Sequence, residues 1–194
     1  MAHYAIVVEL ARCIGCHGCE IACKNENNIA LGEYWNKVVE RGPFGEYPDL
    51  EMYFLPTMCQ QCQDAPCVNV CPTGASYRDA DGMVLVDKEK CIGCKYCMMA
   101  CPYGVRSWNA AESVVEKCTL CGQLTSVGEE PKCVAACCAS ARFYGDLDDP
   151  NSDASKALAA AGADSVHRLK DVGNGPQTAY ILSATYAEWT EEVK

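Results

Sequence analysis

Sixteen of the 17 cysteines in this chain fall into four groups of four, and their spacing constrains the fold more than any other feature. In each group the last cysteine follows the third after three intervening residues. Two groups, CIGCHGCEIACK and CIGCKYCMMACP, share the whole spacing CxxCxxCxxxC. The four groups are Cys13, Cys16, Cys19 and Cys23; Cys59, Cys62, Cys67 and Cys71; Cys91, Cys94, Cys97 and Cys101; and Cys118, Cys121, Cys133 and Cys137.

Disulfides, zinc and iron–sulfur clusters are the three uses of cysteine at this density. A disulfide framework needs an exporting context and an even count, whereas the chain has 17 cysteines. Zinc sites commonly join two CxxC pairs across a loop, which leaves no role for three close ligands and a fourth one turn later. Bacterial ferredoxins have that spacing, with three thiolates on one [4Fe–4S] cube and the fourth on a neighbouring cube. The sequence therefore predicts four [4Fe–4S] clusters.

The segment between the second and third groups indicates how the groups pair. Its residues PTGASYRDADGMVLVDKEK predict a strand over Ala75–Arg78, a turn at Asp81-Gly82 and a strand over Met83–Asp87. Both groups also end in Cys-Pro, as the ferredoxin run does. Residues 59–101 thus form a complete two-cluster ferredoxin module. The first and fourth groups lack the proline and pair by exclusion, although a simple tandem pairing in chain order is the rival arrangement.

The three-plus-one rule then assigns four ligands to each cube. The predicted sets are Cys13, Cys16, Cys19 and Cys137 for cluster one; Cys23, Cys118, Cys121 and Cys133 for cluster two; Cys59, Cys62, Cys67 and Cys101 for cluster three; and Cys71, Cys91, Cys94 and Cys97 for cluster four. The predicted fold class is α+β, with two interlaced bacterial-ferredoxin-type modules. Residues 1–58 and 102–145 form the outer module, residues 59–101 the inner one, and residues 146–194 a C-terminal extension.

Charge and hydropathy limit the partners. The formal net charge of −10 argues against nucleic acid or an anionic membrane surface, and four cubes with their thiolates would add about −8. No apolar run approaches the about 18 residues of a membrane span. The first residues lack an export signal, and Tyr4–Leu10 predicts a strand. Basic residues beside the cysteines could offset the cluster charge: Arg12, Lys24, Lys90, Lys95, Lys117 and Lys132. We expect His17 to be exposed and the leftover Cys138 to be a buried, inert thiol.

The segments outside the cysteine groups predict docking surfaces. Residues 24–58 form an insertion rich in Tyr, Trp and Phe, with a strand near Met52–Leu55, and aromatic residues suit a subunit interface. From Pro150 the sequence predicts a helix with Ser152 near its N-cap and Gly162 at its end. The tail predicts a strand over Ala179–Leu182 and then a short acidic amphipathic helix. We expect this extension to pack on a partner.

The nested cysteine pattern, with FYGDLDDPNSDASKAL after the last group, closely resembles the iron–sulfur subunits of the dimethyl sulfoxide reductase family. The resemblance covers nearly the whole chain. It implies a non-catalytic electron-transfer subunit of a molybdopterin oxidoreductase complex in anaerobic respiration, and the sequence has no phosphate loop or nucleophile–base pair of its own. The nitrate reductase branch has Trp at the position of Cys94, so four cubanes and no three-iron centre are expected here.

The resemblance also implies partners and places. The chain would relay electrons between a molybdopterin catalytic subunit and a quinol-linked membrane subunit or another redox partner, with cluster one nearest the catalytic subunit and cluster four at the far end. The complex would lie on the outer face of the cytoplasmic membrane, carried by its partner's export signal, or in the cytoplasm. The alternative function is a free-standing polyferredoxin that shuttles electrons between soluble enzymes, which would need only a small docking face.

Overall fold

A central four-stranded sheet brings the two ends of the chain together. The structure is a computed structural model that describes residues 2–192. The sheet has the order β8-β1-β10-β9 and contains β1 (Tyr4–Glu9), β8 (Arg142–Asp146), β9 (Val166–His167) and β10 (Ala179–Ile181). Strand β1 runs antiparallel to β8 and parallel to β10, and Val7 is the register partner of both Phe143 and Ala179. Residues 5–8 are fully buried, which explains why the predicted first strand is an unbroken apolar run.

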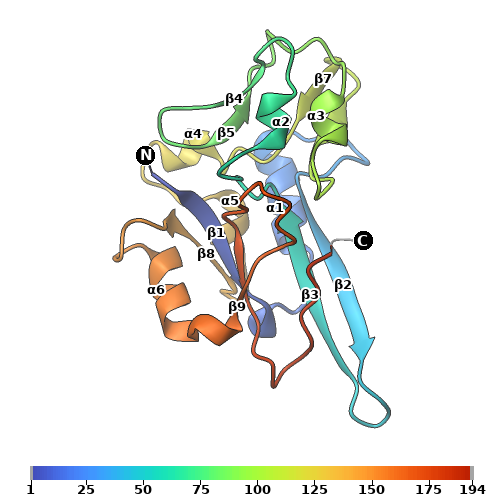
Figure 1. Cartoon of the computed structure of the whole chain (residues 1–194), viewed down its shortest axis with the longest axis vertical. Helices are drawn as coiled ribbons and strands as arrows, with labels where there is room; N and C mark the ends of the chain where they lie inside the picture. The colour runs from blue at the N-terminus through green and yellow to red at the C-terminus, as the bar shows by residue number, and fades with distance from the viewer. Residues whose placement is uncertain (1, 193–194) are drawn as a thin grey trace.

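Three antiparallel hairpins complete the strands. The longest, β2 (Asn36–Phe44) with β3 (Glu51–Met58), extends from the body at the end opposite the second and third cysteine groups (Figure 1). The hairpin of β4 (Ser76–Arg78) and β5 (Val84–Val86) confirms the predicted strand–turn–strand between the second and third cysteine groups. The strand predicted near residues 52–55 is confirmed as part of β3. The sequence did not predict β2, nor the hairpin of β6 (Ser107–Asn109) and β7 (Val114–Glu116).

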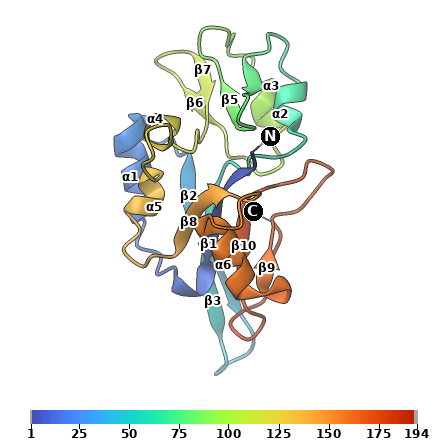
Figure 2. The same ribbon diagram turned by 90° about the vertical axis from the view of Figure 1, so that its left-hand side faces the viewer.

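Helices of four to ten residues overlap all four cysteine groups, and a further helix lies in the C-terminal extension. The elements are the 3-10 turns η1 (Leu10–Arg12) and η2 (Ala163–Ser165) and the helices α1 (Gly18–Asn27), α2 (Pro66–Asn69), α3 (Tyr96–Met99), α4 (Gly122–Thr125), α5 (Lys132–Ala135) and α6 (Asp153–Ala161). Helix α1 contacts α5, and α2 contacts α3. Figure 2 shows these two pairs in different parts of the molecule. The helices of the first and fourth cysteine groups therefore lie together, as do those of the second and third.

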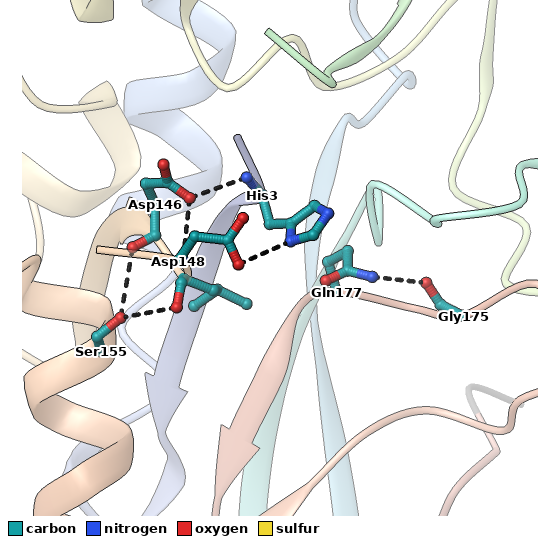
Figure 3. Close-up of polar contacts among 7 residues, drawn as sticks. His3, Asp146, Asp148, Ser155, Gly175 and Gln177 are labelled. Atoms are coloured by element: carbon teal, nitrogen blue, oxygen red, sulfur yellow. Dashed lines mark hydrogen bonds and ion pairs between the residues drawn. The ribbon is translucent and has the colours of Figure 1, made fainter. Parts of the chain in front are cut away.

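The C-terminal extension packs on the central sheet through α6. As predicted, Ser152 is the N-cap, and its side chain accepts a hydrogen bond from the Ser155 amide over 3.1 Å. Gly162 ends the helix with a φ of 76°. Figure 3 shows how the turn before α6 holds the start of β1: the His3 amide donates to Asp146 Oδ1 over 2.9 Å, and Ser155 Oγ donates to the Asp146 carbonyl over 3.3 Å.

The tail corrects one prediction and confirms another. The predicted strand is present as β10, but the short acidic helix is wrong for the described residues, because residues 183–192 form a turn and then irregular chain. The reason is long-range packing of Trp189. Its ring stacks on His167 at 5.0 Å and on Tyr53 at 6.4 Å between centroids, and the amide of Thr190 donates to the Tyr53 hydroxyl. Residues 193–194 of the predicted helix lie outside the described residues.

Candidate iron–sulfur sites

The CIGC loops curl because two positions in each take up left-handed backbone. Gly15 and Gly93 have φ values of 66° and 68°, and a Cβ at Gly15 would lie 2.5 Å from the ring of Phe54. Two residues further on, His17 and Lys95 also have positive φ, 57° and 63°. The same curl in both loops explains why the CIGC sequence occurs twice. It folds three closely spaced cysteines around one concave surface.

Three internal cavities are each lined by four cysteines from two different groups. Within residues 2–192, no three His, Cys, Asp or Glu side chains are placed to hold one metal ion. The thiols instead line the walls of small cavities, as ligands at separate corners of a cube would. The three sets are Cys13, Cys16, Cys19 and Cys137; Cys59, Cys62, Cys67 and Cys101; and Cys71, Cys91, Cys94 and Cys97.

The four remaining predicted ligands lie together between α1, α5 and the start of α4. Burial raises the pKa of the Cys23 thiol, and the neighbouring Cys118, Cys133 and Cys121 raise it further. The Asn27 amide nitrogen lies 3.8 Å from the sulfur atoms of both Cys23 and Cys121. The structure thus brings the 16 predicted ligands together in the four predicted sets; their ligation of clusters stays a prediction.

The four sets differ in their access to solvent. Cys16 in the first set and Cys94 in the fourth are exposed, whereas every cysteine of the second set and three of the four in the third are buried. Cysteine thiols of neighbouring sets also interact electrostatically. In each of three cysteine pairs, burial raises the pKa of one thiol. The other cysteine of the pair belongs to the adjacent set, and its charge raises that pKa further. These pairs are Cys19 with Cys133, Cys59 with Cys118, and Cys67 with Cys97.

Two buried arginines lie among the thiols and were missed in the sequence. Arg106 and Arg142 are 6% and 4% exposed. Burial alone would lower the pKa of each guanidinium, but the charge that nearby cysteines carry when deprotonated raises the net pKa above its ordinary value. Within residues 2–192 neither forms an ion pair with a carboxylate, and Arg106 Nη1 and Arg142 Nε have no hydrogen-bond partner.

These two arginines also test whether the cavities suit the predicted clusters. A buried cation without a counter-charge is strongly unfavourable, so buried charges in proteins are paired. A [4Fe–4S] cube with four thiolates carries about −2 and offers sulfur acceptors. Anionic clusters in the cavities would therefore supply both the missing negative charge and the missing acceptors. The residues present fit the group.

Hydrogen bonds to cysteine sulfur add to this environment. Asn174, which is 3% exposed, donates from Nδ2 to Cys62 Sγ over 2.9 Å and to the Tyr103 hydroxyl over 2.9 Å. The Ser76 amide donates to Cys71 Sγ over 3.3 Å. Such bonds favour the charged sulfur and tune clusters. Asn174 lies in the C-terminal extension, in the turn DVGNG, and no sequence signal pointed to it.

The six basic residues beside the cysteines have different environments. Lys117 is 2% exposed and lies next to Cys118, whose pKa burial raises and the lysine lowers. Lys95 lies over the Trp108 ring and lines the cavity of the fourth set. The other four have partners away from the cavities or are exposed: Arg12 pairs with Glu9, Lys90 pairs with Asp87, Lys24 bonds to the Ala30 carbonyl, and Lys132 is exposed. Two of these six residues, Lys95 and Lys117, therefore lie beside predicted cluster sites, in addition to the two buried arginines.

Cys138 is placed differently from our expectation. The prediction of a buried thiol is wrong: Cys138 is exposed, and its sulfur lies 3.7 Å from that of Cys16. The preceding Cys137 turns into its cavity and accepts a hydrogen bond from the Ala141 amide, so the next side chain points outward. His17 is exposed, as predicted.

Comparisons with known proteins agree with the cysteine chemistry. A family model described as a 4Fe-4S dicluster domain matches residues 50–147, and a second one with this description matches residues 12–75. A dimethyl sulfoxide reductase iron–sulfur subunit of Halobacterium salinarum is 42% identical, over 93% of this chain and 79% of its own length. The arsenate respiratory reductase iron–sulfur subunit ArrB of Shewanella sp. is 36% identical, over 92% and 95%. The thiosulfate reductase electron transfer subunit PhsB of Salmonella typhi is 39% identical, over 95% of both chains.

Proposed function

The chain belongs to the family of iron–sulfur subunits of dimethyl sulfoxide reductase-type oxidoreductases, and we propose that it relays single electrons through four [4Fe–4S] clusters. It is an electron-transfer subunit and not a catalytic one. The observation that carries the four-cluster proposal is the sorting of 16 cysteines into four separate sets, each drawn from two groups. Each bound cluster would supply one-electron chemistry.

The same sorting supports the interlaced arrangement of modules over the tandem one. The first and fourth cysteine groups share two sets, and the second and third share the other two. A tandem pairing in chain order would instead mix the first group with the second. We therefore propose residues 1–58 with 102–145 as the outer module and residues 59–101 as the inner one.

The proposed order of the clusters is supported by which sets are neighbours. The three close thiol pairs join the first set to the second, the second to the third, and the third to the fourth. Exposure of Cys16 and Cys94 suits electron exchange with partners at the two ends. Buried cysteines in the middle sets suit sites that exchange electrons only with each other. We propose cluster one as the end nearest the catalytic subunit and cluster four as the far end.

Exposed apolar side chains support a docked subunit over a free polyferredoxin. On the β2–β3 hairpin Tyr47 is 89% exposed and Leu50 52%, and in the loop before it Leu31 is 98% exposed. Beside cluster four, Ile92 and Met99 are 66% and 73% exposed. Surfaces of this kind at both ends are typical of interfaces. We propose that a molybdopterin subunit covers one and a membrane or other redox subunit the other.

The membrane contact in this scheme belongs to a partner. No helix within residues 2–192 has the length and apolar character to cross a bilayer. We propose that the chain works in a respiratory complex on the outer face of the cytoplasmic membrane, with an exported partner, or in the cytoplasm. The substrate would be set by the catalytic subunit.

Anaerobic purification tests the proposal directly. Iron and acid-labile sulfide should each approach about 16 per chain, and reduced samples should show spin-coupled electron paramagnetic resonance signals from neighbouring cubes. Co-expression with a molybdopterin subunit should give a stable complex in which a quinol or dye donor drives turnover through this chain. Zinc with little sulfide, or a monomer that passes electrons freely to unrelated enzymes, would contradict the proposal.

A further inference from the structure

Arg106 and Arg142 occupy equivalent positions in the two modules. Each lies five residues after the last cysteine of its group, the third group for Arg106 and the fourth for Arg142. Arg106 directly precedes strand β6, and Arg142 begins strand β8. One neutral side chain anchors each guanidinium: Ser76 Oγ accepts from Arg106 over 2.7 Å, and Asn36 Oδ1 accepts from Arg142 over 3.2 and 3.3 Å.

Each guanidinium faces cysteines of both sets in its own module. For Arg106 the neighbours are Cys67 and Cys59 of cluster three and Cys97 of cluster four, and the side chain lines the cluster three cavity. For Arg142 they are Cys133 and Cys118 of cluster two and Cys19 of cluster one, and the side chain lines the cluster one cavity. Both arginines therefore lie at the boundary between two clusters.

We propose that each arginine is a shared tuning charge, which raises the reduction potentials of both clusters in its module together. Reduction adds one negative charge to a cluster, and a fixed cation nearby stabilises the reduced form. The interaction is strong because both guanidinium groups are buried, away from screening water. Arginine stays protonated at every accessible pH, so this contribution does not vary with pH.

The proposal rests on the four-cluster function above and adds two residues that are not ligands. It explains why both cations keep unpaired donors and lack carboxylate partners in the described chain. A carboxylate partner would cancel the charge that the clusters use. The neutral anchors Ser76 and Asn36 hold each guanidinium in place without cancelling it.

Redox titration of the full, cluster-loaded chain, followed by electron paramagnetic resonance, tests this proposal. Arg106→Gln should lower the potentials of clusters three and four and leave clusters one and two unchanged. Arg142→Gln should do the reverse. We expect at least a tenfold change in the ratio of oxidised to reduced cluster at fixed potential, which is about 59 mV for one electron. Arg106→Lys and Arg142→Lys keep the charge and should shift the ratio less than about threefold.

Arg41→Gln is the matched control. Arg41 also has unpaired donors, but it lies on β2 and lines none of the three cysteine cavities, so no potential should move. Unmoved potentials in the Gln variants at full iron content would overturn the arginine proposal, as would equal shifts in Lys and Gln variants. If one Gln variant loses iron, the other tests the same idea in the second module. Iron and sulfide far below four cubes in the unmodified chain would instead overturn the four-cluster function.

Discussion

We predict that Cys138 can replace Cys16 as a ligand of cluster one, and the variant Cys16→Ala tests this prediction. The two sulfur atoms are 3.7 Å apart, both residues are exposed, and Cys16 lines the first cavity. Rotation of Cys138 by one staggered position moves its sulfur by about 3 Å, which nearly spans that gap. We expect the thiol of Cys138 to replace that of Cys16 and cluster one to remain a cube.

The expected loss in this variant is small. A strained side-chain rotamer costs about 1 kcal/mol, which corresponds to about a fivefold weaker hold on the cluster. The variant should therefore keep about 16 irons per chain. Cys94→Ala is the matched comparison, because Cys94 is the equivalent exposed cysteine of cluster four and the 17th cysteine lies beside cluster one. That variant should fall to about 15 irons, with a three-iron centre.

Iron analysis with electron paramagnetic resonance of oxidised samples is the assay, because an oxidised three-iron centre gives a signal that an oxidised cube does not. Cys138→Ala alone should keep all four cubes. The double variant Cys16→Ala/Cys138→Ala should have a three-iron centre at cluster one, as Cys94→Ala should at cluster four. A three-iron centre in the single variant Cys16→Ala would refute the reasoning. A changed cluster four signal in that variant would refute the assignment of Cys16 to cluster one.

Three further predictions concern residues around the clusters. Asn174→Leu removes a hydrogen bond to a cysteine sulfur of cluster three, so the reduction potential of that cluster alone should fall in a redox titration. The expected shift is about 1 kcal/mol, or about fivefold in the ratio of oxidised to reduced cluster. The control variant Asn151→Leu should leave every reduction potential unchanged. Trp189→Ala removes stacked rings and should lower the free energy of unfolding in denaturant by about 2–4 kcal/mol, and Tyr186→Ala by much less. Arg142→Met should stabilise the cluster-free chain by about 1–4 kcal/mol and destabilise the loaded chain, measured by the same unfolding assay.

Each of these has a clear contrary result. If Asn174→Leu leaves the reduction potential of cluster three unchanged, this hydrogen bond has only a structural role. Equal destabilisation by the two tail variants would mean that the stacking does not hold the tail. The same sign of stability change with and without clusters in Arg142→Met would mean that the clusters are not the counter-charge of this residue.

Local chemistry made parts of the fold predictable. The hairpin of β4 and β5 follows from an Asp-Gly turn between two apolar runs, and α6 follows from a serine cap and a glycine stop. The prediction of a tail helix was wrong because the local pattern suits a helix, whereas the fold packs the Trp189 ring against other aromatic rings. These rings lie on three strands: Tyr53 on β3, His167 on β9 and Tyr180 on β10. Strand β2, NKVVERGPF, carries Gly and Pro and gave no strand signal.

The cysteine sets were predictable for a different reason. Cube geometry fixes which spacings can share a cluster, so the sequence alone limits the partners of each thiol. The arginines were missed because they do not adjoin a cysteine. Their common offset of five residues from the last cysteine of a group is a signal that comparing the two modules could have found. Asn174 reaches Cys62 across 112 positions, and only the folded chain brings them together.

The distribution of cysteines in the core links the fold to electron transfer. Six of the seven buried cysteines of the middle sets pack with Ile6, Leu55 and Leu120 in one continuous cluster of core side chains. The interior sets contribute directly to the core. If they hold the proposed clusters, losing the metal would remove both the counter-charge of the arginines and the centre of the core. The end sets contribute only one buried cysteine each to this core, Cys19 and Cys97. A different partner subunit would therefore contact the exposed loops of the two end sets. The buried arginines and the buried cysteines of the middle sets lie away from such a contact.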